Sequence, residues 1–325
     1  MATYYVDPAA TGSNSGTLAD PWTSLQSAAD TAVAGDVVLC KGAQTLSTAI
    51  TFGTNSGSIA SGFIKYIGCN ATWENDGTLF ELDGNNSSAN GIYINGRAYL
   101  YFENIHVRQC TSIGFNHANA YWKHSVFNNC KASNNGSHGF SLNYEGADGE
   151  CNYFFKCTSI NNGGSGFYRP YRHVFLCLCR AENNASYGID LGDGARSSAI
   201  FGCLVVNNAH GIRSKGGLFM ANTVDGSTSG AGIDVISSIG PAIFIGNRIT
   251  NNAANGISGG ALTLLGWNFI NNNLAEVVGN VGYLLDNGAE TNQTTGTQGY
   301  VNAANGDYNL TADATMRRVA VTLPE

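Results

Sequence analysis

The chain has little charge and little proline. Aspartate, glutamate, lysine and arginine make up 12% of its 325 residues, against roughly 25% in typical globular domains, and only five residues are proline. The net charge of −7 provides no basic field, so the composition predicts no nucleic-acid partner. No apolar run has the length of a bilayer-spanning helix, so no membrane span is expected.

Residues that form turns are abundant. Glycine accounts for 42 residues, and asparagine is frequent, often as Asn-Asn pairs. Both are poor helix formers and good turn formers, while a hydrophobic content of 43% argues against disorder. The composition therefore predicts short packed strands joined by turns. The first residues lack a basic region followed by an apolar stretch, so no signal peptide is expected in this chain.

A repeat of about 23 residues runs through most of the sequence. Its marker is a glycine followed by a large apolar residue, and Asn-Asn precedes five of the eight instances by a few residues. The instances are Gly91-Ile92, Gly114-Phe115, Gly139-Phe140, Gly166-Phe167, Gly188-Ile189, Gly211-Ile212, Gly232-Ile233 and Gly256-Ile257. Each repeat predicts one coil of three short strands, stacked on the next at roughly 4.8 Å.

A second column lies eight to ten residues before most of these glycines. It contains Asn104, Cys130, Cys157, Cys179, Cys203, Asn222, Asn247 and Asn268. A stacked amide ladder satisfies turn backbone groups that would be costly to bury unpaired, and cysteine fits the same place as a small apolar residue. The sequence therefore predicts free, buried thiols at the four cysteines. Parallel side chains on neighbouring coils suit disulfide geometry poorly.

These patterns predict one all-β domain over residues 1–325, a single-stranded right-handed parallel β-helix with three strands per coil. Residues 1–36 are expected to form an N-terminal cap, with an amphipathic helix over residues 21–35 that ends at Gly35. Residues 37–273 are expected to form the coils. Residues 274–325 lose the repeat and are expected to form a C-terminal cap.

Both ends of the chain resemble one superfamily. The N-terminal motifs are Tyr4–Pro8, Gly12–Thr17, Pro21-Trp22 and Ala34–Val38, and the C-terminal motif is Gly306–Thr311. They are similar to the opening and closing segments of pectate-lyase-like β-helix proteins. The resemblance implies a polysaccharide partner and an extracellular or virion-associated location. It leaves open lyases, epimerases, hydrolases and non-catalytic phage tail proteins, and a tailspike would imply a trimer.

In proteins of this superfamily the active groove lies along the first sheet and the loops that follow it. Here that sheet is expected to hold the Gly-Ile strands, with the residue after Ile or Phe pointing outward. The outward column reads Tyr93, Asn116, Ser141, Tyr168, Asp190, Arg213, Asp234 and Ser258. The following loops add Tyr144, Glu145, Asp148, Glu150, Arg169, Tyr171, Arg172, His173, Asp193, Arg196 and Lys215. A chain poor in charge thus concentrates charge and aromatic rings on one face, which is typical of a glycan groove.

A uronate lyase needs a cation to neutralise the substrate carboxylate and a base for the proton next to it. Arg213, Arg172 or Lys215 fit the first role, and Tyr168, His173 or Lys215 the second. The candidate catalytic residues are Tyr168, His173, Asp190, Arg213 and Lys215. The candidate substrate-binding residues are Tyr144, Arg169, Tyr171, Arg172, Asp193 and Asp234. The alternative is that Asp190, Arg213 and Asp234 form only a solvated ion-pair ladder.

Two further activities are considered. Tyr187–Asp193 is similar to the mannuronan-epimerase signature "YGFDPHD", but Leu191-Gly192 replaces its Pro-His. A hydrolase of the polygalacturonase type would need two carboxylates, and Asp190 and Asp234 are expected two coils apart, roughly 9 to 10 Å. Gly211–Lys215 resembles the "RIK" segment of polygalacturonases, whose paired-Asp segments are absent.

Calcium often assists lyases of this superfamily. Glu145, Asp148 and Glu150 place three carboxylates on one short segment, which suits a hard cation. The alternative interpretation of this segment is a polar turn.

Overall fold

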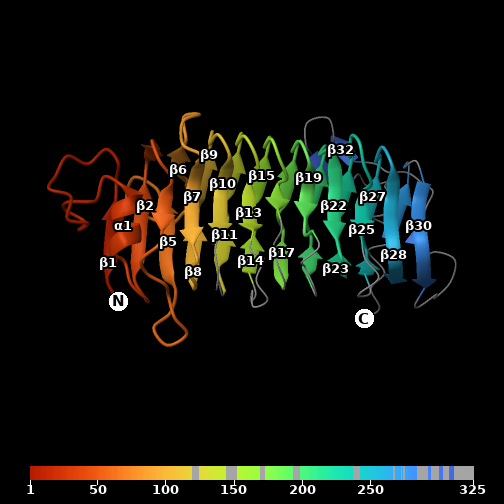
Figure 1. Cartoon of the computed structure of the whole chain (residues 1–325), viewed down its shortest axis with the longest axis horizontal. Helices are drawn as coiled ribbons and strands as arrows, with labels where there is room; N and C mark the ends of the chain where they lie inside the picture. The colour runs from red at the N-terminus through yellow and green to blue at the C-terminus, as the bar shows by residue number, and fades with distance from the viewer. Residues whose placement is uncertain are drawn as a thin grey trace.

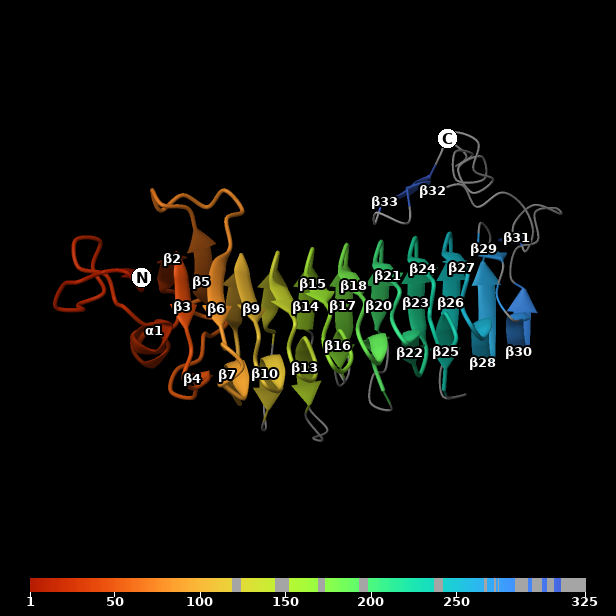
Figure 2. The ribbon, with the colours of Figure 1, turned by 90° about the horizontal axis from the view of Figure 1, so that it is seen from above.

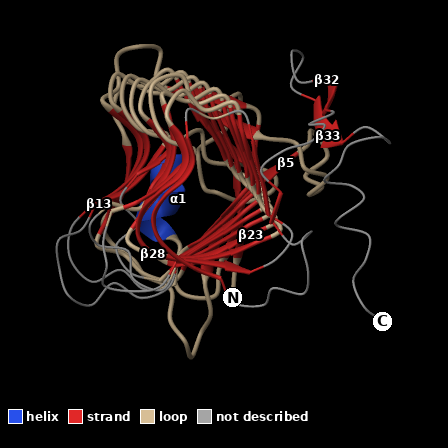
Figure 3. Cartoon of the chain, turned by 90° about the vertical axis from the view of Figure 1, so that its right-hand side faces the viewer, coloured by secondary structure: helices blue, strands red, loops and turns tan. Residues whose placement is uncertain are grey.

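A computed structural model gives the fold. The structure describes residues 1–118, 124–143, 152–168, 173–192, 198–236, 242–265, 268–271, 273, 275–283, 292–293, 300–302 and 307–310. The chain winds into a long solenoid with its N-terminal part at one end (Figure 1). Viewed along the long axis, rows of strands surround a closed interior (Figure 3). Among the residues described, no helix is both long and apolar enough to span a bilayer.

Each coil contributes one strand to each of three parallel ladders. Ladder 1 contains β4 (Ile50–Phe52), β7 (Asn90–Asn95), β10 (Ile113–Ala118), β13 (Phe140–Asn143), β16 (Phe167–Tyr168), β19 (Tyr187–Asp190), β22 (His210–Ser214), β25 (Ile233–Val235) and the first part of β28 (Asn255–Leu265). The prediction of parallel coils with three strands each is confirmed.

Ladder 2 contains β1 (Thr3–Val6), β2 (Val37–Lys41), β5 (Ile64–Cys69), β8 (Leu100–Glu103), β11 (Val126–Asn128), β14 (Asn152–Phe155), β17 (Val174–Cys177), β20 (Ala199–Phe201), β23 (Gly217–Met220), β26 (Ala242–Ile245) and the second part of β28. Because β28 is long enough to serve both, it joins ladders 1 and 2 into one sheet. β30 (Ala275–Tyr283) pairs along β28, so the parallel pairing continues beyond residue 273, where the coils were expected to end.

Ladder 3 contains β3 (Ala43–Thr45), β6 (Phe80–Asp83), β9 (Ile105–Arg108), β12 (Lys131–Ser133), β15 (Thr158–Ile160), β18 (Arg180–Glu182), β21 (Leu204–Val206), β24 (Thr223–Asp225), β27 (Arg248–Thr250), β29 (Asn268–Asn271) and β31 (Asn292–Gln293). Outside the three ladders, β32 (Tyr300–Asn302) and β33 (Asp307–Leu310) pair antiparallel and lie beside the coils (Figure 2).

Like residues stack in the interior. Along ladder 1, the ring of Phe140 stacks on those of Phe115 and Phe167, with centroid distances of 4.6 and 5.0 Å. Ladder 2 adds the stacked pair Phe127–Phe154 at 4.9 Å, which meets Phe140 edge-on. Each such ring contact contributes about 0.5–1.5 kcal/mol beyond area burial. The aromatic columns therefore hold neighbouring coils together and couple two walls of the solenoid.

The predicted Cys/Asn column lies in the turn between ladders 2 and 3. Asn222 Nδ2 donates to the carbonyl of Ile200 at 2.8 Å, in the preceding coil, and Cys203 Sγ lies 3.6 Å from the carbonyl of Leu176 in the same way. Cys130, Cys157, Cys179 and Cys203 are free and buried, as expected. Burial raises the pKa of the last three well above its ordinary value, so these side chains are thiols.

The prediction is wrong for one member of this column, Asn104. Lys131 pairs with His106 and Asn128 with Glu103, so Ile105 lies opposite Cys130. Asn104 instead precedes the column, with a φ of 54°, in the left-handed conformation that asparagine tolerates.

A second amide ladder lies in the turn between ladders 3 and 1, and explains the Asn-Asn pairs. The first Asn of each pair has a φ of 52° to 56°. The second is buried, and in four of the five pairs its amide donates a hydrogen bond to the equivalent asparagine in the next coil. Asn184 Nδ2, for example, donates to Asn208 Oδ1 at 2.9 Å, and Asn162 Nδ2 donates to Asn184 Oδ1 at 2.9 Å. The pair therefore makes the turn with one residue and satisfies its backbone with the other.

Helix α1 (Leu25–Thr31) lies at the N-terminal end and is shorter than the predicted residues 21–35. Ser24 caps its first turn by accepting a hydrogen bond from Gln26 N, which fixes the start. Trp22 is extended and forms a parallel bridge with Val6, and Ala32 is extended as well. Leu25, Ala28 and Ala29 are buried in the same core as the strands.

Two buried imidazoles are expected to make the fold sensitive to acid. Burial lowers the pKa of His117 on β10 to about 3, and burial together with Lys131 lowers that of His106 on β9 to about 4. An unfolded histidine titrates near pH 6.5, so below that pH the unfolded state binds protons that the folded state does not. Stability is therefore full above about pH 6.5 and is lost as the pH falls toward the folded pKa values.

Between about pH 6.5 and 5, above the range where carboxylates titrate, each histidine is expected to lower the free energy of unfolding by up to about 1.4 kcal/mol per pH unit. Urea denaturation at a series of pH values measures this slope. The variant His117→Leu, which places another leucine between Ile94 and Leu142, should lose about half of it. An unchanged slope in His117→Leu would show that His117 does not cause the acid sensitivity.

Candidate functional site

The outward column predicted for ladder 1 is confirmed in register. Tyr168 pairs with Asp190, Asp190 with Arg213, and Arg213 with Asp234. Before Tyr168 the predicted column runs through Tyr93, Asn116 and Ser141, and after Asp234 it reaches Ser258. The neighbouring inward residues are buried, so the strands place this polar column on the outer face of ladder 1.

Asp190 and Arg213 form the centre of this face. Arg213 Nε donates to Asp190 Oδ1 at 2.8 Å and Arg213 Nη2 to Oδ2 at 2.9 Å, so the pair is bidentate. The Asp190 side chain is only 4% exposed and that of Arg213 is 28% exposed. Burial by itself lowers the pKa of Arg213, but the hydrogen bonds and charge of Asp190 outweigh it and raise the pKa. The guanidinium is therefore a fixed positive charge.

Aromatic rings lie beside this pair and further along the same face. The Arg213 guanidinium lies 4.7 Å from the centre of the Tyr187 ring, which also stacks on His210 at 4.6 Å. Further along the face, His138 and Tyr168 stack almost parallel with a centroid distance of 3.7 Å. His138 Nδ1 accepts a hydrogen bond from Ser165 N at 2.9 Å. The face thus combines flat rings with a fixed cation.

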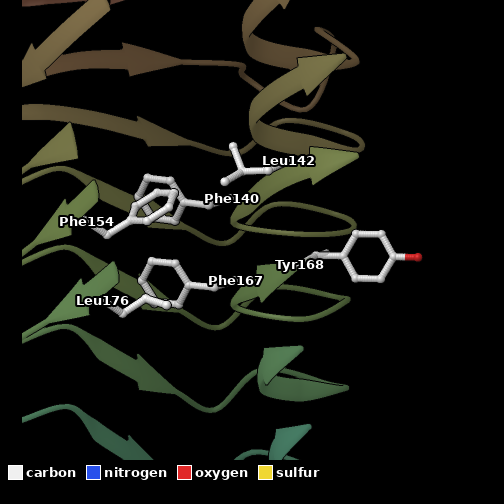
Figure 4. Close-up of a pocket in the computed structure, with 6 residues that line it drawn as sticks. All are labelled: Phe140, Leu142, Phe154, Phe167, Tyr168 and Leu176. Carbon is white, nitrogen blue, oxygen red and sulfur yellow. The ribbon is translucent and has the colours of Figure 1, made fainter. Parts of the chain in front are cut away.

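Tyr168 points away from the core (Figure 4). The side chains of Phe140, Leu142, Phe154, Phe167 and Leu176 face the interior, and the Tyr168 hydroxyl points in the opposite direction. The gap that these side chains leave is too narrow for a water molecule. Any ligand of Tyr168 therefore binds at the outer surface of the solenoid.

The predicted ion-pair ladder does not extend to Asp234. Arg213 forms its ion pair with Asp190, and among the residues described no ion pair joins it to Asp234. Asp234 Oδ1 instead accepts a hydrogen bond from Ser258 Oγ at 2.8 Å. Asp190 and Asp234 do lie two coils apart, as expected.

The remaining predicted residues are spread over the face and its edge. Lys215 follows β22 directly and is half-buried, two residues after Arg213. His173 is exposed and precedes β17, at the start of ladder 2. Other predicted positions lie outside the residues described: Tyr144, Glu145, Asp148, Glu150, Arg169, Tyr171, Arg172, Asp193 and Arg196.

The calcium prediction rests on Glu145, Asp148 and Glu150, which lie outside the described residues, so it stays a prediction. Among the described residues no group of three or more His, Cys, Asp or Glu side chains is arranged to hold a metal ion.

Sequence reasoning missed three members of the face, His138, Tyr187 and His210. All three precede the marker glycine directly, and each stacks on another residue of the face. The sequence does contain a signal for them. The residues directly before the marker glycines form a column of their own, in which Tyr187 pairs with His210.

No protein-family model and no curated protein sequence matches the chain. Solved structures do. A pectate lyase, Pel9A, superposes with a TM-score of 0.67 at 16% identity, over 97% of this chain and 90% of that one. The chain has the pectate-lyase-like parallel β-helix fold.

Two other pectate-lyase-like structures match over most of the chain. An alginate lyase from Paenibacillus sp. str. FPU-7 gives a TM-score of 0.60 at 14% identity, over 90% of this chain and 98% of that one. A rhamnogalacturonan lyase gives 0.53 at 15% identity, over 91% and 87%. At these identities the likeness establishes the fold, which is the one expected from the terminal motifs.

Proposed function

We propose that the protein is a polysaccharide lyase that cleaves an acidic, uronate-containing glycan by β-elimination at the outer face of ladder 1. The observation that carries the proposal is the fixed Arg213 guanidinium, which is held by a buried Asp190 and contacts the ring of Tyr187, itself stacked on His210. The names of the structural neighbours, which act on pectin, alginate and rhamnogalacturonan, support it. We propose with it an extracellular or virion-associated location, where such glycans are met.

Arg213 is assigned to the substrate carboxylate. Its pair with Asp190 uses Nε and Nη2, so the Nη1 end of the guanidinium is not part of that contact. Binding the uronate there neutralises the carboxylate and makes the proton on the adjacent carbon more acidic. Tyr187 and Tyr168 provide flat rings beside the carboxylate position, on which sugar rings stack.

Lys215 is assigned as the base. The base must reach the proton on the carbon next to the bound carboxylate. Lys215 follows Arg213 by two residues, about 7 Å along the chain. Tyr168 is two coils away from Arg213, roughly 9 to 10 Å, which suits contact with a neighbouring sugar better. Lys215 takes the proton, the electron pair forms the carbon–carbon double bond, and the glycosidic carbon–oxygen bond breaks. The phenolic hydroxyl of Tyr187 protonates the leaving oxygen.

The Asp190 geometry favours a lyase over a hydrolase. Both carboxylate oxygens of Asp190 accept hydrogen bonds from Arg213, and Oδ1 accepts another from Gly192 N at 2.9 Å. A carboxylate held in this way is a poor general acid or base. Its separation from Asp234, roughly 9 to 10 Å, is at the upper limit of the inverting range.

The test is the ultraviolet absorbance of unsaturated uronate ends, measured on alginate, pectin and glycosaminoglycans. We expect one of these to be cleaved, and Lys215→Ala to lower the rate by about 10²–10⁴-fold, as for loss of a general base. Lys156→Ala removes an exposed lysine from the turn after β14 and is the matched control, with an unchanged rate.

If the assay yields new reducing ends without ultraviolet absorbance, the protein is a hydrolase and the lyase proposal is wrong. Epimerised uronate without cleavage would replace it by an epimerase, and glycan binding without either product would make the face a non-catalytic binding surface.

A further inference from the structure

The outer face of ladder 2 changes character along the solenoid. In the N-terminal coils its outward residues include Lys65, Glu103 and Asn128. From β14 to β26 the two outward columns contain no charged residue. Their side chains are half-buried, and they include Phe155, Phe175, Phe201, Leu218, Met220 and Ile243. We call the outward residues of β14, β17, β20, β23 and β26 the apolar strip.

The other two walls of the same coils are polar. The outer face of ladder 3 carries the ion pair of Arg180 with Glu182. The outer face of ladder 1 carries the Asp190–Arg213 pair. The apolar strip therefore does not reflect a general lack of polar residues in these coils. A contiguous apolar face of this kind is typical of an interaction surface.

We propose that the apolar strip is the contact between two copies of this chain, packed face to face about a twofold axis. Two flat sheets pack about 10 Å apart with their strands nearly aligned, and identical apolar strips satisfy this arrangement without any charge matching. A sugar chain and a lipid surface both fit the strip less well than a second copy does. A sugar chain needs hydrogen-bonding groups, and only Tyr153 in the strip carries a hydroxyl. An anionic lipid surface is opposed by the net charge of −7.

The size of the strip sets the strength of the contact. Five strands at the inter-strand spacing make it about 24 Å long, and two outward columns make it about 13 Å wide, so each copy contributes about 300 Å². A stable interface buries about 1,200–2,000 Å² over both partners, of which the two strips, about 600 Å² together, would supply between about a third and a half. Leu178 adds a 53% exposed apolar side chain at the edge, in the turn after β17. Association is therefore expected to be reversible and to increase with concentration.

Sedimentation velocity from about 5 µM to about 500 µM tests the proposal on the intact chain. We expect self-association that persists at high salt, because apolar contacts are not screened. Phe201→Glu places a charge in the middle of the strip and should raise the dissociation constant about tenfold or more. Thr158→Glu adds the same charge on ladder 3, between Lys131 and Arg180, and should leave it unchanged.

Circular dichroism and thermal unfolding show whether Phe201→Glu is folded, and Met220→Lys, on the neighbouring strand β23, repeats the test if it is not. Phe201→Leu keeps the strip apolar and should keep the association. The proposal is overturned if the chain stays monomeric over the whole range. It is also overturned if the association survives both charged substitutions, or if salt dissociates it.

Discussion

Replacing Arg213 by alanine is expected to lower the free energy of unfolding by about 3–5 kcal/mol, because it leaves a buried carboxylate without its partner. Asp190 is almost inaccessible to solvent, and Arg213 supplies a hydrogen bond to each of its oxygens. Tyr187 loses its guanidinium contact in the same variant. Urea denaturation measures the stability. The same variant is expected to lose activity on the acidic glycan, since no fixed cation remains to bind the carboxylate.

A double variant separates the two roles of Arg213. In Asp190→Leu/Arg213→Met both charges are replaced by apolar groups of similar size, and such replacements of buried pairs are often neutral for stability. We therefore expect the double variant to recover most of the stability lost by Arg213→Ala and to recover none of the activity. Activity in the double variant would show that the pair has a structural role alone. Normal stability of Arg213→Ala would show that the pair is an ordinary surface ion pair.

Asn184→Leu is expected to destabilise the solenoid by more than about 4 kcal/mol. Asn184 Nδ2 donates to the carbonyl of Ser159 and to Asn208 Oδ1, and its Oδ1 accepts from both nitrogens of Asn162. All these groups are buried, and each one left without a partner costs about 1–3 kcal/mol. Leucine fills the volume but replaces none of the four hydrogen bonds.

The preceding residue provides the control. Asn183 is exposed and has a φ of 52°, a conformation that glycine adopts without strain. Asn183→Gly is therefore expected to change the free energy of unfolding by less than about 1 kcal/mol. Thermal unfolding of both variants shows the contrast. Equal losses would mean that the Asn-Asn pair acts only through its turn conformation, and the buried ladder would contribute nothing specific.

The columns of the fold were predictable from the sequence because a parallel coil places equivalent residues above one another. The outward positions of Asp190, Arg213 and Asp234 followed from their place after the marker glycine alone. Asn104 was misplaced by one position because asparagine suits both a left-handed turn residue and a buried amide ladder. Residue type alone did not distinguish these two positions.

The pairing within the face was not predictable in the same way. Arg213 lies between two aspartates in the ladder, and sequence periodicity does not say which of them it contacts. The choice depends on side-chain rotamers and on local partners such as Ser258. His138 stacks with Tyr168 and Tyr187 with His210, in each case between different coils. The two stacks have different separations along the sequence. Repeat lengths from 21 to 27 residues obscure such contacts.

The amide ladders have a consequence for how this protein can change over evolution. Most of the buried asparagines bond to an equivalent residue in the coil before or the coil after them, so most neighbouring coils are joined by the same kind of connection. Duplication or loss of one whole repeat would leave these connections intact at the junction. The outer face of ladder 1 would then become longer or shorter by one position. Gene segments of one coil are therefore natural units of variation, by which the length of this face changes while the fold is retained.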